Sequence, residues 1–317
     1  MAGFDLTAPG ISFSGGFTIT NAPAPAPATN TAAWFGGGYS RSTVQRITYA
    51  TDTATASVRG PLSAARYYLA AAGNATNGWF GGGMNPPVST VNRITYATDT
   101  ATASVRGPLS LGRRQPGAAA NTTDGWFGGG YINAGGPTVS RVDRITFATD
   151  TATASVRGPL SLARWRLAAA GNTDYGWFGG GYSSSDRSTV DRITYATDTA
   201  TASVRGPLSA VIGYFAAAGN TTDAWFGGGY IGANRSTVNR ITYATDTATA
   251  AVRGPLSLAR GYFAAAGNTT DGWFGGGYTP AVSRVDRITY ATDTATASVR
   301  GPLSVATRQH AAAGGIQ

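Results

Sequence analysis

The pentapeptide Trp-Phe-Gly-Gly-Gly occurs six times in this chain, beginning at Trp34, Trp79, Trp126, Trp177, Trp225 and Trp273. Successive copies follow one another at a period of roughly 45–51 residues, which is typical of β-propeller blades and exceeds that of most helical repeats. The sequence therefore predicts an all-β, six-bladed propeller.

A single repeat, residues 60–106, has the pattern of a four-stranded meander. Its short apolar or β-branched runs are separated by Asn, Gly, Asp and Pro. We expect the first strand at 68–72, the second to end in three glycines, and Asp99-Thr100 to make the turn between strands three and four. Small residues in strands one and two permit close approach of blades near the axis. The turn aspartate recurs in every repeat, and we expect it to satisfy the local backbone.

Length varies at one place in the repeat. The spacing from the Arg of Arg-Ile-Thr to that of Val-Arg-Gly is the same in every repeat, and so is the spacing from there to the next Trp. The segment from Trp to Arg-Ile-Thr alone changes in length, from its shortest form in the first repeat to its longest in the third. Every insertion is therefore predicted in the loop between strands two and three.

The two ends of the repeat array complement each other. Residues 301–317 repeat the start of a blade through Ala-Ala-Ala-Gly, whereas the first copy, from Thr31, has no such strand before it. The C-terminal strand is thus predicted to close blade one and to hide two sheet edges. We divide the chain into an N-terminal arm, residues 1–30, and a propeller, residues 31–317.

Composition excludes several classes of protein. All 24 basic residues are Arg, all 15 acidic residues are Asp, and Cys is absent, which excludes disulfides and thiolate metal sites. Twelve arginines recur at two fixed places per repeat, so despite a net charge of +9 we expect solvated or Asp-paired structural arginines and no nucleic-acid partner. No apolar run is long enough to span a bilayer and no signal-peptide pattern occurs, so neither membrane insertion nor a signal peptide is predicted.

The repeat resembles the kelch type of β-propeller. The resemblance rests on the glycine triplets, on the third-strand aromatics and on the Arg after the Pro turn: Gly36, Gly37, Gly38, Tyr49, Tyr96, Phe147, Tyr195, Tyr243, Tyr290, Arg66, Arg113, Arg164 and Arg260. Two repeats depart from it by placing Ile212 and Thr307 where the Arg stands, and the fourth-strand Trp of the family is Ser or Ala. The segment Ala-Thr-Asp-Thr-Ala-Thr-Ala-Ser-Val-Arg-Gly-Pro-Leu-Ser also resembles repeat proteins of marine cyanobacterial tailed viruses, which implies a virion component.

The chain is poor in groups that perform catalysis. Its one His, His310, lies in the closing strand, where packing or a water contact is more plausible than chemistry. Neither a copper site of the galactose-oxidase kind nor a sialidase-like site with its Glu can be built from these residues. We therefore predict no enzymatic activity, no cofactor and no metal site.

Candidate partner-binding residues lie in the loops between strands two and three and in the segments between strands four and one. Both sets emerge on one face, and they are rich in residues that rigid scaffolds use for recognition. The candidates are Tyr67, Tyr68, Arg114, Tyr131, Asn133, Trp165, Arg166, Arg187, Tyr214, Arg235 and Tyr262. The longest loop, residues 131–143, is the strongest candidate for contact with a partner. The alternative is that the loops vary by drift and that the aromatics are buried between blades.

The arm has a different character. Ile11, Phe13, Phe17 and Ile19 fall within a stretch that alternates apolar and polar residues around a Gly pair, and an Ala-Pro run from Ala22 predicts a stiff polyproline II spacer. Because such a small β-element is marginal alone, we expect it to be held by another protein, or by its own propeller.

Together these patterns predict a non-enzymatic structural or adhesive component on the tail or capsid exterior of a phage virion. The arm would anchor it to another virion structural protein, and the variable loop face would be available for a host surface glycan or receptor. The alternative is a cellular kelch-like protein-interaction scaffold or a lectin.

Overall fold

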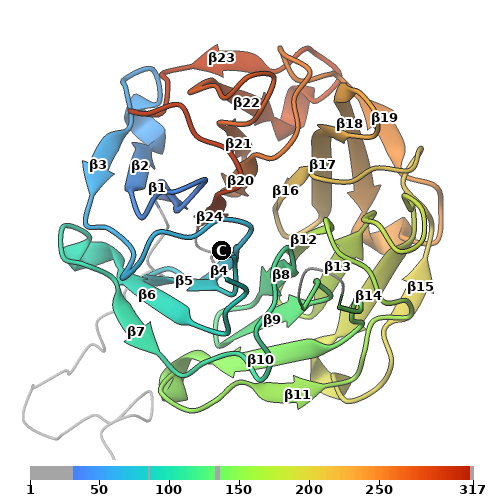
Figure 1. Ribbon diagram of the computed structural model, residues 1–317. Helices are drawn as coiled ribbons and strands as arrows, with labels where there is room; N and C mark the ends of the chain where they lie inside the picture. The colour runs from blue at the N-terminus through green and yellow to red at the C-terminus, as the bar shows by residue number, and fades with distance from the viewer. Residues whose placement is uncertain (1–30, 85, 133–135, 315–317) are drawn as a thin grey trace, which may run out of the picture.

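The chain folds into a six-bladed β-propeller. The computed structural model describes residues 31–84, 86–132 and 136–314. These residues form six antiparallel sheets of four strands each, which surround a central axis (Figure 1). The fold predicted from the repeat period is confirmed.

In each blade the two strands nearest the axis are the most buried. The innermost strands are β24 (Ala311–Ala313), β4 (Ala70–Gly73), β8 (Gly117–Ala120), β12 (Ala168–Gly171), β16 (Ala216–Gly219) and β20 (Ala264–Gly267). The second strands, which carry the Trp-Phe pair, are β1 (Ala32–Gly36), β5 (Asn77–Gly81), β9 (Asp124–Gly128), β13 (Tyr175–Gly179), β17 (Asp223–Tyr230) and β21 (Asp271–Gly275).

The outer half of each blade consists of a third strand, a 3₁₀ turn and a short outer strand. The third strands are β2 (Val44–Thr48), β6 (Val91–Thr95), β10 (Val142–Thr146), β14 (Val190–Thr194), β18 (Asn234–Thr242) and β22 (Val285–Thr289). The 3₁₀ turns are η1 (Tyr49–Thr51), η2 (Tyr96–Thr98), η3 (Phe147–Thr149), η4 (Tyr195–Thr197), η5 (Tyr243–Thr245) and η6 (Tyr290–Thr292). The outer strands are β3 (Ser57–Arg59), β7 (Ser104–Arg106), β11 (Ser155–Arg157), β15 (Ser203–Arg205), β19 (Ala251–Arg253) and β23 (Ser298–Arg300).

Blade one is completed by the end of the chain, as the sequence predicts. Strand β24 pairs antiparallel with β1, with Ala313 opposite Trp34 and Ala311 opposite Gly36. The sheet order is β24-β1-β2-β3. Closure in this manner leaves neither end of the ring with an unpaired inner edge.

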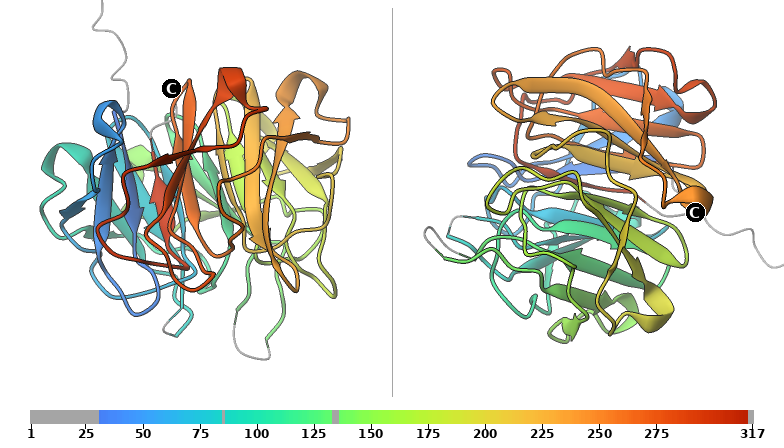
Figure 2. Two further views of the ribbon diagram at one scale, coloured as in Figure 1. Left: turned by 90° about the horizontal axis from the view of Figure 1, so that it is seen from above. Right: turned by 90° about the vertical axis from the view of Figure 1, so that its right-hand side faces the viewer.

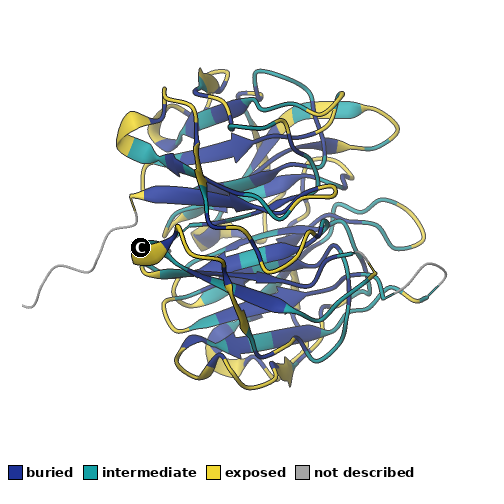
Figure 3. Cartoon of the chain, turned by 60° about the vertical axis from the view of Figure 1, so that its left-hand side comes forward, coloured by how far each residue is buried: buried dark blue, intermediate teal, exposed yellow. Residues whose placement is uncertain are grey.

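The hydrophobic core lies between neighbouring blades. Trp34 of blade one, for example, shares an apolar cluster with Leu62, Phe80 and Ile94 of blade two. The Trp ring stacks on the aromatic residue that begins the 3₁₀ turn of the following blade, with a centroid distance of 3.7 Å for Trp34 and Tyr96. The sequence placed this aromatic in the third strand, which ends one residue earlier. Buried residues accordingly fill the middle of each blade, whereas exposed residues concentrate in the connections (Figure 3). Because each large ring is buried against the next blade, a single blade cannot bury its own core.

Two glycines of the first triplet show why this motif consists of residues without a Cβ atom. A Cβ on Gly36 would lie 2.9 Å from the ring of Phe80, so the first glycine makes room for the phenylalanine of the next blade. Gly37 has φ +76° and a Cβ there would lie 2.7 Å from the carbonyl oxygen of Arg66. This left-handed backbone is accessible to Gly at little cost. The close approach of neighbouring blades that the small residues predict is thus confirmed at these glycines.

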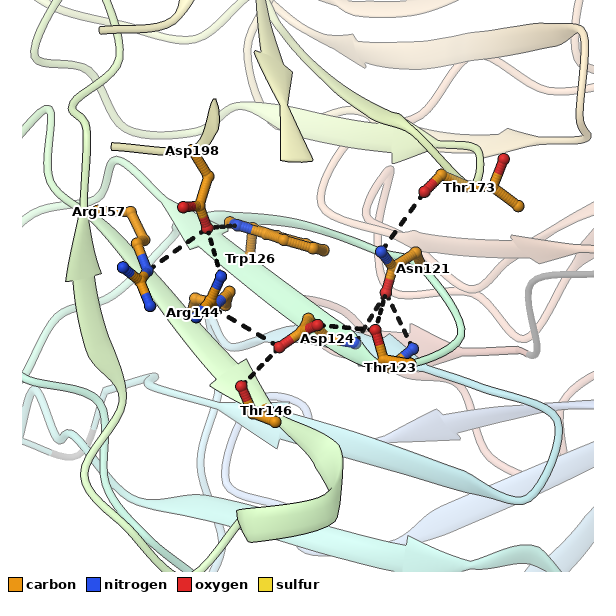
Figure 4. A network of polar contacts seen from close by, with 9 residues as sticks. All are labelled: Asn121, Thr123, Asp124, Trp126, Arg144, Thr146, Arg157, Thr173 and Asp198. Carbon is orange, nitrogen blue, oxygen red and sulfur yellow. Dashed lines mark hydrogen bonds and ion pairs between the residues drawn. The ribbon is translucent and has the colours of Figure 1, made fainter. Parts of the chain in front are cut away.

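The recurring turn aspartate joins adjacent blades. Asp198 of blade four accepts hydrogen bonds from Trp126 Nε1 (2.8 Å) and Arg144 Nη1 (3.1 Å) of blade three, and Arg157 lies 3.4 Å away (Figure 4). Asp52 repeats the arrangement across the ring closure with Trp273, 2.9 Å away. The expectation that these carboxylates satisfy the local backbone is therefore wrong, because they bind side chains of the neighbouring blade. The expectation that the twelve recurring arginines are Asp-paired is confirmed.

A second buried polar interaction occurs in four of the six blades, where it involves the Arg that precedes the innermost strand. In blade four, Arg164 is fully buried, 2.8 Å from the carboxylate of Asp191, and donates to the carbonyl oxygen of Phe178. The same Arg–Asp pair occurs in blades three and six, and in blade two Arg66 donates to Asn92. Where the Arg is replaced, by Ile212 or Thr307, the carboxylate is replaced too, by Asn239 or Gln45. A buried carboxylate therefore occurs at this position only where the described structure supplies a guanidinium.

The connections of the meander divide the propeller into two faces. We call the face formed by the loops between second and third strands and by the segments between fourth and first strands the variable face. Its longest loops project from the lower edge of the molecule in the left view of Figure 2. The opposite, constant face holds the turns that begin at Asn74, Asn121, Asn172, Asn220 and Asn268, and the 3₁₀ turns. Thr31, which accepts a hydrogen bond from Tyr49 N (2.9 Å), begins the described chain on the constant face.

Candidate functional site

The variable face is built from one backbone pairing repeated in each blade. The residue that precedes the innermost strand by a few positions pairs with the residue that follows the glycine triplet. The bridges are Tyr67 with Met84, Arg114 with Tyr131, Trp165 with Tyr182, Gly213 with Tyr230 and Gly261 with Tyr278. In blade one, Tyr39 N donates to Arg308 O (3.1 Å). The side chains differ from pair to pair on a constant backbone.

A ring of six residues closes the axis on this face. Tyr68, Gln115, Arg166, Tyr214, Tyr262 and Gln309 stand at one equivalent position in the six blades, and each has a left-handed φ between 55° and 62°. The backbone N–H of each of these residues donates to the carbonyl oxygen of the residue at the equivalent position in the preceding blade, at 2.6–3.3 Å. The six hydrogen bonds therefore form a closed circle. We call these six residues the axial ring.

The conformation of the axial ring is costly for residues that carry a Cβ. Left-handed backbone is disfavoured by about 1–2 kcal/mol for such residues, and most other left-handed positions in the described chain are Gly. The chain has 45 glycines but none at these six positions. Strain retained in this way points to a role for the side chains.

Those side chains line a small cavity on the axis. It has a volume of about 70 Å³ and is floored by buried residues such as Phe215, Phe263 and His310. The rings of Tyr214 and Tyr262 are 3.9 Å apart, and Gln309 Nε2 donates to the Tyr68 hydroxyl (2.7 Å). Burial raises the pKa values of Tyr68 and Tyr262 well above the ordinary range, so their hydroxyls stay protonated at neutral pH.

An arginine–aromatic cluster adjoins the axial ring. The Arg166 guanidinium carbon lies 4.0 Å from the ring centroid of Trp165, 4.3 Å from that of Tyr214 and 4.8 Å from that of Tyr182. Arg114 lies similarly over Tyr131 and Trp165, whose rings are 4.9 Å apart. Cation–π contacts of this kind contribute about 0.5–2 kcal/mol each, and no carboxylate of the described residues forms an ion pair with either arginine.

Positive charge is concentrated on the variable face. Of the 24 arginines, 17 make an ion pair within the described structure, and seven do not. The seven are Arg41, Arg66, Arg114, Arg166, Arg187, Arg235 and Arg308, all from segments of the variable face. Within the described part of the variable face, in the loops between second and third strands and in the segments between fourth and first strands, Asp186 is the single residue with a carboxylate. The twelve recurring arginines are evenly spread, as expected, but the unpaired charge is one-sided.

Most of the predicted candidates lie close to the axis. Tyr68, Arg166, Tyr214 and Tyr262 belong to the axial ring, and Tyr67 contacts it through Tyr68, with ring centroids 5.1 Å apart. Arg114, Tyr131 and Trp165 form the adjoining cluster described above. Arg187 lies in an outer loop, where it donates to Ser184 (3.2 Å), and Arg235 is exposed in strand β18. Asn133 and the arm residues Ile11, Phe13, Phe17 and Ile19 lie outside the described residues.

Two members of the axial ring are not evident from the sequence, and a third, Tyr68, is misplaced by it. Gln115 and Gln309 were not among the candidates because neither is aromatic or charged. Tyr68 was expected to begin the first strand, which instead begins at Ala70. Alignment of the six repeats on the residue two positions after Arg66 was the signal that could have identified the ring. The predicted burial of some aromatics between blades is confirmed for Phe215 and Phe263, which are 6% and 5% exposed.

Blade five has a pocket of its own. Where Ile212 replaces the buried Arg, an apolar cavity of about 220 Å³ remains between Phe215, Phe226 and Ile231. Asn239 at its edge accepts a hydrogen bond from Ser209 N (2.9 Å). Ile212 lines this cavity, and blade five also differs from the other blades in its longer strands β17 and β18.

The remaining polar groups fit structural roles. His310 is 5% exposed, and burial lowers its pKa to about 4, so it is neutral at physiological pH. Among the described residues, no three His, Cys, Asp or Glu side chains lie close enough together to hold a metal ion. None of the described helices has the length and apolar character needed to cross a membrane.

Comparison with known proteins adds no assignment. No protein-family model matches the sequence, and no curated protein matches it either.

Proposed function

We propose that this propeller is a non-enzymatic recognition module whose variable face binds a partner at the mouth of the axis. The observation that supports this most strongly is the axial ring, where six strained positions hold Tyr, Gln and Arg in a chain otherwise rich in Gly. The unpaired arginines and the stacked aromatics beside it supply polar and apolar contacts together. A propeller is a rigid scaffold suited to such display.

We further propose that the module belongs to the exterior of a tailed-virus particle and that its ligand is a host surface glycan. The resemblance of the repeat to proteins of marine cyanobacterial viruses supports the first part, and the kelch-like repeat pattern is compatible with it. Thr31 lies on the constant face, so a chain anchored through residues 1–30 would present the variable face outward. The second candidate is a cellular scaffold that binds a protein through the same face.

Substitution of Tyr67, Trp165 and Tyr262 by Ala is expected to lower glycan binding by more than about tenfold. Aromatic residues in a central patch commonly carry most of the binding free energy, with about 2 kcal/mol lost on truncation of each strong contact. Binding of the full-length chain and of the variant to a printed glycan array gives the measurement.

The control for this experiment lies on the opposite face. Ala75→Ser and Thr221→Ala change turn positions beside Asn74 and Asn220, whose side chains make the hydrogen bonds of their turns. Loss of binding by this control with an unchanged melting temperature places recognition on the constant face. Failure of the unsubstituted chain to bind any saccharide favours the protein-binding scaffold.

Deletion of residues 1–30 is expected to leave a folded propeller that no longer joins its assembly. The closed ring has no unpaired inner edge that the arm is needed to cover, whereas the alternating segment at 11–20 suits strand addition to a partner. Circular dichroism checks the fold, and incorporation into particles on co-expression checks assembly. Incorporation at the unmodified level would assign attachment to the ring.

A further inference from the structure

The cavity inside the axial ring offers hydrogen-bonding groups that the protein itself leaves unused. Gln115 is 6% exposed, lines this cavity, and neither its amide nitrogen nor its amide oxygen has a hydrogen-bond partner among the described residues. The buried amide oxygen of Gln309 also has none in this part of the chain. Unsatisfied buried polar atoms are unfavourable, so a side chain kept in this state is suited to an incoming polar group.

Arg166 brings a positive charge to the same cavity. Its guanidinium rests on aromatic rings, its Nε is buried without a hydrogen bond, and it makes no ion pair within the described structure. The charges of Arg166 and Arg114 also act on the Tyr68 hydroxyl. The cavity therefore presents a cation, amide groups and protonated phenols, and no carboxylate from the described residues lines it.

The size of the cavity limits what can enter. About 70 Å³ is room for a few water molecules or for one small polar group, and a whole sugar ring does not fit. A planar carboxylate suits the planar guanidinium, which can donate two parallel hydrogen bonds to it. The partly exposed rings of Tyr214, Tyr262 and Trp165 at the rim are placed to contact an apolar ring face that remains outside.

We infer that the axial ring binds the carboxylate of an acidic saccharide residue, with Arg166 as its counter-ion, Gln115 as a hydrogen-bond donor and the rim aromatics against the sugar ring. This inference rests on the proposed function and names the ligand class of the same site. It distinguishes acidic saccharides from neutral ones, and a uronic or nonulosonic acid from a sulfated sugar.

The test compares two ligands that differ in the charge of their carboxyl groups. The full-length chain is titrated with tri-galacturonate and with its fully methyl-esterified form, followed by saturation-transfer NMR and calorimetry. The acid is expected to bind at least tenfold more tightly than the ester, and sodium sulfate at equal ionic strength is expected not to displace it. Equal binding of acid and ester, displacement by sulfate, or no binding of the acid at millimolar concentration overturns the inference.

Matched variants locate the effect. Arg166→Gln installs the residue that two other blades already carry at this left-handed position, as Gln115 and Gln309, so the fold is expected to tolerate it. It is expected to lower affinity for tri-galacturonate at least tenfold. Arg235→Gln removes the same charge from an exposed arginine on the same face and is expected to change affinity less than twofold. Equal losses in the two variants would assign the effect to diffuse charge and overturn the inference.

A third variant separates binding from folding. Gln115→Met replaces the unpartnered amide by an apolar group of similar length, so we expect weaker acid binding together with an equal or higher melting temperature. Weaker binding together with a lower melting temperature would indicate a structural role for Gln115 and overturn its assignment as a ligand donor. Glycan-array binding that needs Tyr67, Trp165 and Tyr262 but is unaffected by Arg166→Gln would preserve the proposed function and reject this ligand class.

Discussion

Removal of residues 308–317 is expected to abolish cooperative unfolding of the propeller. The truncation deletes β24, which pairs with β1, and Gln309, whose N–H donates to Tyr262 O (2.6 Å) and whose carbonyl accepts from Tyr68 N (2.7 Å). It breaks the hydrogen-bonded circle at the axis and exposes an inner edge beside the apolar core. We expect a broad, non-cooperative thermal transition with aggregation, measured by circular dichroism and light scattering.

A circular permutant provides the control for closure. Joining residues 308–316 directly to Thr31, in a chain that ends at residue 307, places the same strand ahead of β1 as in the other five blades. This chain lacks the arm, so its reference is residues 31–317. The permutant is expected to melt as cooperatively as the reference. A truncated protein with an unchanged melting temperature would show that β24 is dispensable and would contradict closure by a shared blade.

Substitution of Arg164 by Ile is expected to destabilise the protein by about 3–5 kcal/mol, the usual consequence of leaving a buried charge without its partner. Asp191 is fully buried, and Arg164 lies 2.8 Å from it. The variant removes the guanidinium and leaves the carboxylate with Ser161 alone among its described side-chain partners. Urea denaturation followed by Trp fluorescence measures the change in the free energy of unfolding.

The double variant Arg164→Ile, Asp191→Asn copies the combination that blade five already has in Ile212 and Asn239. It is expected to cost about 1–3 kcal/mol less than the single variant, because no charge is left buried. A residual loss is expected, since blade five keeps a cavity of about 220 Å³ beside Ile212. Equal destabilisation by the single and double variants would contradict the charge argument and assign the whole effect to lost volume.

The sequence predicts the candidate site less completely than it predicts the fold. Four of the six axial-ring residues are aromatic or charged and lie in segments of varying composition, so the sequence indicates them. Gln115 and Gln309 are neither aromatic nor charged, and their importance follows from a left-handed backbone and from burial. Arg187 and Arg235 share the composition of the variable segments but do not belong to the axial ring.

The number of blades, the strand order within each, the place of every insertion and the closure of blade one all follow from the amino-acid sequence. These features depend on local patterns repeated six times and on the count of strands at the two ends, so the order of residues along the chain is sufficient to predict them. The contacts of the turn aspartates and of the axial residues, in contrast, emerge only in the folded ring. Asp198 accepts a hydrogen bond from Trp126 because the ring places neighbouring blades side by side. Tyr68 donates its backbone N–H to Gln309 because the ring also brings together the two ends of the propeller. Such contacts between residues far apart in sequence depend on blade-to-blade geometry, which no single repeat contains.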